Sequence, residues 1–353
     1  MTPREMRPRS DTPTLHDVAR EAGVSLATAS RVLNGSTRKV AESFRERVEE
    51  AAERLGYTAN ASAQATARGT SAVIALLVAD IADPYFGLIA SGVARGADEE
   101  GLIVTVAITE RDDARERKIL RALRGQHPRG VILAASRTDD GESATAEELA
   151  AFRSLGARTV TFGPGGDRSI RIDNRGGAER LGREMARVGY RRAIAIGAAE
   201  GVRTSDDRLR GFRDGFAEGG GTILREYRGS FARESGVSSM AAALADGVEP
   251  GTLVFALSDV IAIGAMTAIR DAGRAVGDDI AMCGFDDTPA SRDVTPQLTT
   301  VRVPLSEFGY QAFRATVDED WQQAEAPLEV LVRASTPAVS TVPARGTEQG
   351  VGR

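Results

Sequence analysis

The chain has 353 residues, of which 42% are hydrophobic and 27% charged, and its formal net charge is −5. This length predicts two or three domains with cores of their own. No apolar run reaches the ~18 residues of a membrane span, the N-terminus lacks the apolar stretch of a signal peptide, and the single cysteine, Cys283, excludes an intramolecular disulfide. We therefore expect a cytoplasmic protein with no membrane partner. Two histidines and one cysteine leave little for a zinc site, and no pattern indicates a cofactor.

Charge is divided unevenly along the chain. Residues 1–70 carry 11 Arg and Lys against 9 Asp and Glu, whereas the remainder carries 34 against 41, so the net charges are +2 and −7. The acidic total argues against a protein that coats nucleic acid along its whole surface. The division is compatible with a DNA-binding head on an acidic body.

The first part of the chain is expected to be a leader followed by a compact helical head. The leader contains three prolines and no apolar periodicity, which favours disorder. After it, Thr14 and Asp17 can form a reciprocal helix cap. Gly23 permits a tight turn, and Ser25 can cap a second helix. The pattern predicts a helix–turn–helix, whose second helix fits the major groove of DNA.

The outer face of this second helix carries side chains suited to DNA. Leu26 and Ala27 offer apolar contacts to a thymine methyl group. Thr28 and Ser30 can bind phosphate, and Arg31 can bind guanine or phosphate. A plain helical hairpin with a solvated face is the structural alternative. The head residues assigned to DNA are Thr14, Ser25, Leu26, Ala27, Thr28, Ser30, Arg31 and Asn34.

From residue 72 onward, short apolar runs alternate with amphipathic helical stretches. The predicted strands are Val73–Ala79, Leu102–Thr109, Gly130–Ala135, Thr159–Phe162, Ala193–Gly197, Thr252–Leu257, Ile280–Gly284 and Leu328–Val332. The predicted helices are Phe86–Glu100, Ala114–Gly125, Ala146–Leu155, Gly177–Val188, Ser205–Glu218, Gly236–Asp246 and Val260–Ala272. Continuous apolar strands separated by helices indicate a parallel sheet covered on both faces. This stretch of about 260 residues exceeds one typical sheet, so we expect two α/β lobes.

The head resembles that of the LacI (lactose-repressor) family of bacterial transcriptional regulators. The resemblance rests on Thr14–Gly35, then Val40, the helix Glu42–Leu55, Gly56–Tyr57 and Asn60. It implies a three-helix head and a hinge helix that lies in the minor groove of a palindromic operator bound by a homodimer. It also assigns Asn60, Gln64, Thr66 and Arg68 of this hinge to DNA.

The hinge departs from the family at one position. Thr66 stands where the family has a leucine that wedges into the central base step. A wedge must be apolar and long enough to replace base stacking, so Thr66 predicts a shallower kink, or groove contact without full intercalation. An inert linker at 61–67 is the structural alternative.

The resemblance extends over residues 72–337. It rests on Asp80–Phe86, Ile172–Asn174, Asp207–Phe212, Cys283–Asp287 and Pro296–Val301. It implies a periplasmic-binding-protein-like body, which is two Rossmann-like lobes joined by three crossovers near Asp173, Thr300 and Pro327. The resulting divisions are a disordered leader 1–13, a helix–turn–helix domain 14–57, a hinge 58–71, an N-terminal lobe 72–172 with 301–326, a C-terminal lobe 173–300 with 327–337, and a disordered tail 338–353.

Candidate ligand groups follow the predicted strands, where ligands of such sheets bind. Carboxylates can accept hydrogen bonds from sugar hydroxyls, an arginine fork can donate them, and aromatic rings can stack on a sugar ring. Asp80 and Asp259 have helix caps as their structural alternative, and Phe231 has a core position. The residues assigned to a small-molecule effector, a sugar or other polyol, are Asp80, Tyr85, Phe86, Ser136, Arg208, Phe231, Asp259 and Asp286.

Catalysis is not indicated. His16 and His127 are far apart in the pattern, and no Gly-Lys-Ser/Thr, His-Glu-x-x-His or Gly-x-Ser-x-Gly motif occurs. We therefore expect a homodimeric, cytoplasmic (nucleoid-associated) transcriptional regulator, most often a repressor, whose affinity for operator DNA is controlled by a sugar. The alternatives are a solute-binding protein with no DNA role, and the same regulator with a nucleobase effector.

Overall fold

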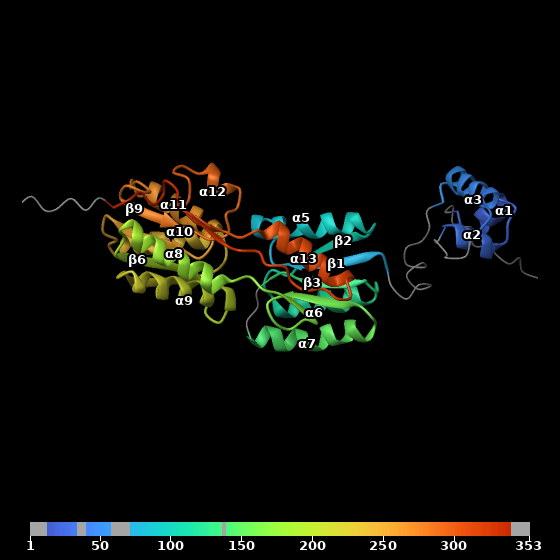
Figure 1. Cartoon of the computed structure of the whole chain (residues 1–353), viewed down its shortest axis with the longest axis horizontal. Helices are drawn as coiled ribbons and strands as arrows, with labels where there is room; N and C mark the ends of the chain where they lie inside the picture. The colour runs from blue at the N-terminus through green and yellow to red at the C-terminus, as the bar shows by residue number, and fades with distance from the viewer. Residues whose placement is uncertain (1–12, 34–39, 58–70, 136–138, 340–353) are drawn as a thin grey trace, which may run out of the picture. The chain divides into compact units, whose positions relative to one another are not determined.

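The computed structural model describes residues 13–33, 40–57, 71–135 and 139–339, with the side chains of 139–144 left out. These residues form two compact units that divide between Ala72 and Val73 (Figure 1). Eight expectations lie wholly or almost wholly outside the described residues: those for the leader, Asn34, the hinge residues Asn60, Gln64, Thr66 and Arg68, Ser136, and the tail.

The first unit, the head, contains three short helices, α1 (Leu15–Glu21), α2 (Leu26–Leu33) and α3 (Glu42–Leu55). The reciprocal cap of Thr14 and Asp17 is present at the start of α1, and the Ser25 hydroxyl accepts a hydrogen bond from the Thr28 amide at 3.1 Å. Gly23 turns the chain between α1 and α2 with φ +63°, a conformation that favours glycine. The buried core consists of Val18, Ala19, Ala22, Ala29, Val48, Ala51 and Ala52.

The second unit, the body, contains two lobes, each built on a parallel sheet. The first sheet has the order β2-β1-β3-β4-β5 and the second the order β7-β6-β8-β9. In the N-terminal lobe the elements are β1 (Val73–Val78), α5 (Pro84–Glu99), β2 (Ile103–Ile108), α6 (Asp113–Arg124), β3 (Gly130–Leu133), α7 (Asp139–Ser154), β4 (Arg158–Phe162) and β5 (Arg168–Ile170). In the C-terminal lobe they are α8 (Asn174–Val188), β6 (Arg192–Ala198), α9 (Arg203–Glu218), β7 (Thr222–Gly229), α10 (Arg233–Ala245), β8 (Thr252–Ala256), α11 (Asp259–Asp271), β9 (Ile280–Cys283) and α12 (Ala290–Asp293).

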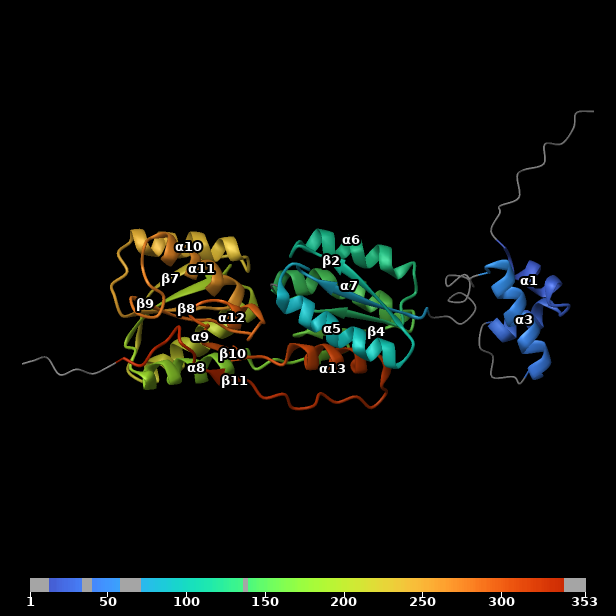
Figure 2. The ribbon, with the colours of Figure 1, turned by 90° about the horizontal axis from the view of Figure 1, so that it is seen from above.

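The chain passes between the lobes three times, as Figure 2 shows. After β5 it enters α8, after β10 (Thr300–Arg302) it returns to α13 (Leu305–Val317), and after α13 it comes back to β11 (Glu329–Leu331). β10 and β11 pair antiparallel, and Arg302 bridges Asp286 in the loop after β9. The crossover strand therefore extends the C-terminal lobe to Arg302, two residues beyond the boundary that the sequence predicts.

Five elements were not predicted from the sequence: β5, β7, β10, α12 and α13. β7 is an edge strand with charged, exposed side chains (Thr-Ile-Leu-Arg-Glu-Tyr-Arg-Gly), so it lacks the apolar run by which a buried strand is recognised. β5 and β10 have three residues each and α12 has four, which is too short for a periodic pattern. The signal for α13 was present, because Leu305, Phe308 and Ala312 are buried at helical spacing.

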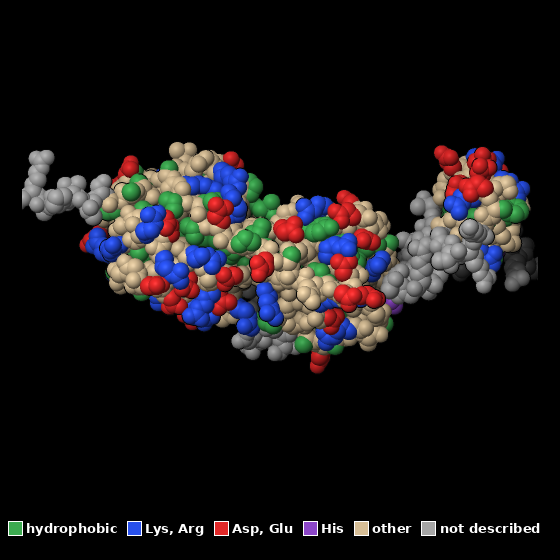
Figure 3. Space-filling model, in the orientation of Figure 1, with side chains coloured by type: hydrophobic (Ala, Val, Ile, Leu, Met, Phe, Trp, Pro, Cys, Tyr) green, Lys and Arg blue, Asp and Glu red, His purple; other side chains and the backbone are tan. Residues whose placement is uncertain are grey.

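The charges of the body are interspersed. On the face seen in Figure 3, Arg and acidic side chains alternate and do not gather into one patch. Arg95 with Glu307 and Arg314 with Glu100 are exposed or half-exposed pairs of this kind. Among the helices of the described ranges, none is long and apolar enough to cross a membrane.

Helices α5 and α13 lie side by side in Figures 1 and 2, and glycines permit this close approach. A Cβ at Gly92 would lie 1.8 Å from the Ser306 carbonyl oxygen, and a Cβ at Gly309 would lie 2.1 Å from that of Ile89. Both obstacles are backbone atoms, so a neighbouring side chain cannot relieve the clash by moving. The contact fixes the crossover helix on the N-terminal lobe.

We expect Gly92→Ala to lower the free energy of unfolding by about 1–3 kcal/mol, the cost of overpacking a tight interface. Gly87→Ala, on the same helix, is the control, because a Cβ there meets nothing within 4 Å. Alanine favours helix over glycine by about 0.5–1 kcal/mol, so this control should be neutral or stabilising. Urea denaturation of both variants measures the difference, and equal midpoints would contradict the proposed role of the α5–α13 contact.

Candidate functional site

Helix α2 presents the side chains expected to face DNA. Leu26 is 39% exposed, and Ala27 and Arg31 are also exposed. Thr28 and Ser30 are half-buried, and the Thr28 hydroxyl lies 2.8 Å from that of Ser25. Small side chains at the start of the helix allow its backbone to approach a groove closely, and Arg31 in its last turn can reach a base or a phosphate.

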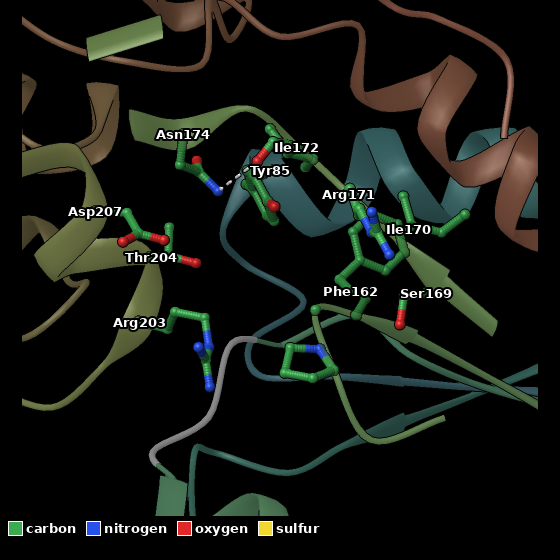
Figure 4. A pocket seen from close by; sticks show the side chains of 13 residues that line it. Tyr85, Phe162, Ser169, Ile170, Arg171, Ile172, Asn174, Arg203, Thr204 and Asp207 are labelled. Carbon is green, nitrogen blue, oxygen red and sulfur yellow. Dashed lines mark hydrogen bonds between the residues drawn. The ribbon is translucent and has the colours of Figure 1, made fainter. Parts of the chain in front are cut away.

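The body contains a cleft between its lobes, at the carboxyl ends of the strands of both sheets. Two adjoining cavities occupy it, one of about 380 Å³ and one of about 30 Å³. Tyr85, from the start of α5, and Thr204, from the start of α9, line both cavities. Figure 4 shows the larger cavity, with α9 on one side and residues of the N-terminal lobe on the other. We call the larger of the two the outer cavity and the smaller one the inner cavity.

Arg208 forms the wall of the inner cavity and is only 1% exposed. Its Nε donates to Asn174 Oδ1 and its Nη1 to the Leu257 carbonyl oxygen, both at 2.8 Å. The guanidinium carbon lies 3.9 Å from the centre of the Phe285 ring. Four segments of the C-terminal lobe therefore meet at one side chain, since Arg208 itself belongs to α9.

The fourth partner of Arg208 is Asp286. Arg208 Nη2 lies 2.8 Å from Asp286 Oδ1, and both side chains are buried. The two charges compensate each other by their proximity, but neither atom has a hydrogen bond of standard geometry to a described residue. Each can therefore still gain from a well-aligned partner. A ligand hydroxyl could donate to Asp286 and accept from Arg208, which would satisfy both atoms.

Burial raises the pKa of Asp286, and the charge of Arg208 opposes this rise. Burial likewise raises the pKa of Asp83, which also lines the inner cavity. The backbone amide of Tyr85 donates to Asp83 at 3.0 Å and opposes that rise. Two carboxyls (Asp83 and Asp286) and two guanidinium groups (Arg111 and Arg208) thus surround this small space, so its charges balance and the arrangement suits a neutral, hydroxyl-bearing group.

The next residue, Asp287, faces away from the cavity and binds three arginines. Its carboxylate oxygens lie 2.7 Å from Arg292, 3.0 Å from Arg302 and 2.5 Å from Arg333. Its side chain is 1% exposed. Although burial acts in the opposite direction, the hydrogen bonds from these arginines lower the pKa of Asp287 to about 2. Arg302 is in β10 and Arg333 follows β11, so Asp287 ties the crossover strands to the loop after β9.

Five of the sequence-assigned effector residues line the inner cavity: Tyr85, Phe86, Arg208, Phe231 and Asp286. Two others do not line either cavity. Asp80 is exposed and accepts a hydrogen bond from the Ala82 amide at 2.9 Å, so it shapes the turn after β1. Asp259 is fully buried.

Both oxygens of Asp259 are occupied by the protein. Oδ2 accepts from the Thr288 amide at 2.7 Å, and Oδ1 accepts from the Thr300 hydroxyl at 2.6 Å. Burial raises the pKa of Asp259, and the nearby charge of Asp286 adds to the rise. Asp259 is therefore corrected from a ligand group to a structural acceptor beneath the site.

Several residues that line the cavities were not predicted from the sequence. Some of them follow a strand, where ligands of such sheets bind, and could have been predicted on that ground. Asp83 lies within the segment after β1, Ser258 follows β8, and Arg111 follows β2. The Arg111 guanidinium lies 4.3 Å from the centre of the Phe231 ring, a cation–π contact between the lobes. Asn174 and Thr204 stand at helix starts and carried no pattern of their own.

Within the described part of the chain, no three His, Cys, Asp or Glu side chains are grouped so that they could hold a metal ion.

Each of the two units matches the model of a known protein family. Residues 14–60 match the model of bacterial regulatory proteins of the lacI family, and residues 183–339 match that of a periplasmic binding protein-like domain.

Among curated proteins, the chain is similar to the HTH-type transcriptional regulator CelR of Thermobifida fusca, with 30% identity over 91% of this chain and 95% of the relative. It is also similar to the HTH-type transcriptional regulator GalR of Escherichia coli (strain K12), with 33% identity over 85% and 87% of the two chains.

Two solved structures have a similar fold over most of the chain. The Lac repressor bound to ONPG in the repressed state aligns with a TM-score of 0.79 and 26% identity over 92% of this chain and 100% of that one. The complex of the transcriptional regulator CelR with cellobiose aligns with a TM-score of 0.64 and 28% identity over 92% and 99%.

We expect Asp287→Asn to lower the free energy of unfolding by about 2 kcal/mol at pH 7, since one pKa unit corresponds to about 1.4 kcal/mol. Because the pKa of Asp287 is depressed from 3.8 to about 2, its stabilising contribution is complete above about pH 4 and is lost as the pH falls toward 2. The difference between variant and wild type should therefore shrink over this interval.

Urea denaturation at a series of pH values between 7 and 3 measures this difference. Asp98→Asn, at an exposed position of α5, is the control and should match the wild type. A difference at Asp287 that stays constant as the pH falls would contradict the assignment of a charged role.

Proposed function

The chain belongs to the LacI family of bacterial regulatory proteins, and on this premise we propose how its two units divide the work. It is a DNA-binding transcriptional regulator. We propose that two heads of a homodimer read a palindromic operator through the exposed face of α2, and that a sugar bound in the cleft of each body changes the affinity for DNA.

A single helix–turn–helix makes few base contacts, so two heads are needed for specificity within a genome. Leu26, Ala27 and Arg31 are the exposed side chains of α2 that support this role.

Because a regulator acts where the DNA is, we propose that the chain works in the cytoplasm. Since its relatives are named as transcriptional regulators, we assign no catalytic step to it.

The sugar proposal rests on the unsatisfied atoms of the inner cavity. Arg208 Nη2 and Asp286 Oδ1 are buried without an aligned hydrogen bond, and a hydroxyl group is both donor and acceptor. Phe231 and Phe86 offer apolar contact beside them. A structural relative at 28% identity is a complex with cellobiose, which agrees with this chemistry. If the state of the lobes that binds the effector better also binds DNA with a different affinity, the effector alters DNA affinity, and DNA alters effector affinity by the same factor.

The first experiment selects high-affinity duplexes for the full chain from a random-sequence library. We expect Arg31→Ala to weaken binding to the selected duplex at least 10-fold, because each of the two heads loses one base contact worth about 1–3 kcal/mol. Arg54→Ala, on α3, removes a surface ion pair with Glu21 of α1; it is the control and should retain the sequence preference. Equal discrimination between selected and random duplexes by Arg31→Ala and the wild type would contradict the role of α2.

The second experiment concerns the effector. A thermal-shift screen of sugars and nucleobases on the full chain identifies ligands, and a hit is then added to the complex with selected DNA. We expect Asp286→Asn to weaken binding of the identified ligand at least 10-fold. A neutral amide has only one acceptor oxygen, so unlike a carboxylate it cannot both pair with Arg208 and accept a hydrogen bond from a hydroxyl. Asp80→Asn should respond as the wild type, since Asp80 lines neither cavity. A nucleobase hit with no sugar hit would favour the alternative effector class.

A further inference from the structure

The outer cavity is lined by neither Arg208 nor Asp286, so the proposed contact with these two residues gives it no role. Its wall from the N-terminal lobe is largely apolar, with Phe162 at the end of β4, Pro164 after it and Ile172 after β5. Its other wall is polar, with Arg203, Thr204 and Asp207 from the first turns of α9. In Figure 4, Thr204 and Asp207 lie on one side of the open space and Phe162 lies on the other.

The two volumes indicate which part of a ligand each cavity can hold. The inner cavity of about 30 Å³ has room for one or two groups of the size of water, because one water needs roughly 10–15 Å³ on this measure. It therefore takes a hydroxyl-bearing edge and not a whole ring. The outer cavity of about 380 Å³ falls within the range of roughly 300–1,000 Å³ that encloses whole small molecules.

One sugar ring does not fill the outer cavity. A hexose has twelve non-hydrogen atoms and occupies on the order of 200 Å³ at the density of an organic crystal. If its hydroxyl edge enters the inner cavity between Tyr85 and Thr204, part of the outer cavity remains beyond the ring. The side chains there are Phe162, Ser169 and Arg171.

The chemistry of this remaining space also fits a sugar. A pyranose ring has apolar faces, which can pack on Phe162 and Pro164, and hydroxyl edges, which can reach Asp207, Ser169 or Arg171. A second ring joined to the first would place its face and its edge against matching walls. A single ring would leave the far part of the cavity to water.

We propose that the effector has two units: a disaccharide-sized glycoside whose first ring inserts its hydroxyl edge beside Arg208 and Asp286, and whose second ring lies against Phe162. This inference rests on the proposed sugar effector and specifies its length. Phe162, Ser169 and Arg171 then determine the preference for the second unit without contributing to the recognition of the first.

The test is calorimetric titration of the full-length protein with one-unit sugars (glucose, galactose, xylose) and two-unit sugars (cellobiose, lactose, maltose, xylobiose). We expect at least one two-unit sugar to bind 10-fold or more tightly than its own one-unit component. Phe162→Ala should remove most of that advantage, whereas Asp286→Asn should weaken both sugars. Leu155→Ala is the control and should retain the advantage, because it truncates a large, exposed apolar side chain of the same lobe that lines neither cavity.

The possible failures are distinct. A one-unit sugar that binds as tightly as its two-unit counterpart overturns the two-unit proposal and leaves the sugar effector intact. An advantage that survives Phe162→Ala overturns the placement of the second ring. Absence of binding by every sugar overturns the sugar effector itself, and with it the inference.

Discussion

The body is organised around a buried ion pair that is close but not hydrogen-bonded, between Arg208 and Asp286. Taking both charges out of water costs several kcal/mol per ion unless good geometry compensates. Arg208 obtains part of this compensation from Asn174 and the Leu257 carbonyl group. These partners lie on α8 and after β8, so the cost of burial is offset only when the carboxyl ends of the C-terminal lobe are correctly assembled.

The incomplete satisfaction of the pair has a functional consequence. Were Arg208 Nη2 and Asp286 Oδ1 aligned on one another, a hydroxyl group would have to break a bond before it could bind. Their present geometry leaves both atoms able to accept a new partner at the wall of the cavity. This geometry supports the proposed effector, because a hydroxyl group both donates and accepts hydrogen bonds.

Asp286 and Asp287 connect this site to the crossovers. Both residues have positive φ, 116° and 53°, a strained conformation for residues with a Cβ. The surroundings hold them there: Asp286 faces Arg208, and Asp287 faces Arg302 and Arg333 beside the crossover strands. Asp286, which lines the inner cavity, and Asp287, which anchors the crossover strands, therefore belong to one short segment.

The sequence by itself determined the parts whose physics is local. The cap at Thr14, the turn at Gly23 and the cap at Ser25 are contacts within a few residues, and the structure contains all three. The strands with continuous apolar runs were also recognisable, because complete burial on both faces demands that composition. Arg208 and Asp286 could be singled out because they lie in segments that resemble the LacI family, Asp207–Phe212 and Cys283–Asp287.

Only the tertiary structure decided which charged groups face the ligand. Asp80, Asp259 and Asp286 all follow apolar strands, yet one shapes a turn, one binds Thr288 and Thr300, and one faces the cavity. The residues that distinguish them lie 29 and 41 positions away from Asp259, so no local pattern carries the distinction. The same holds for the outer cavity, because its opposing walls come from β4, β5 and α9 and exist only when the two lobes are joined.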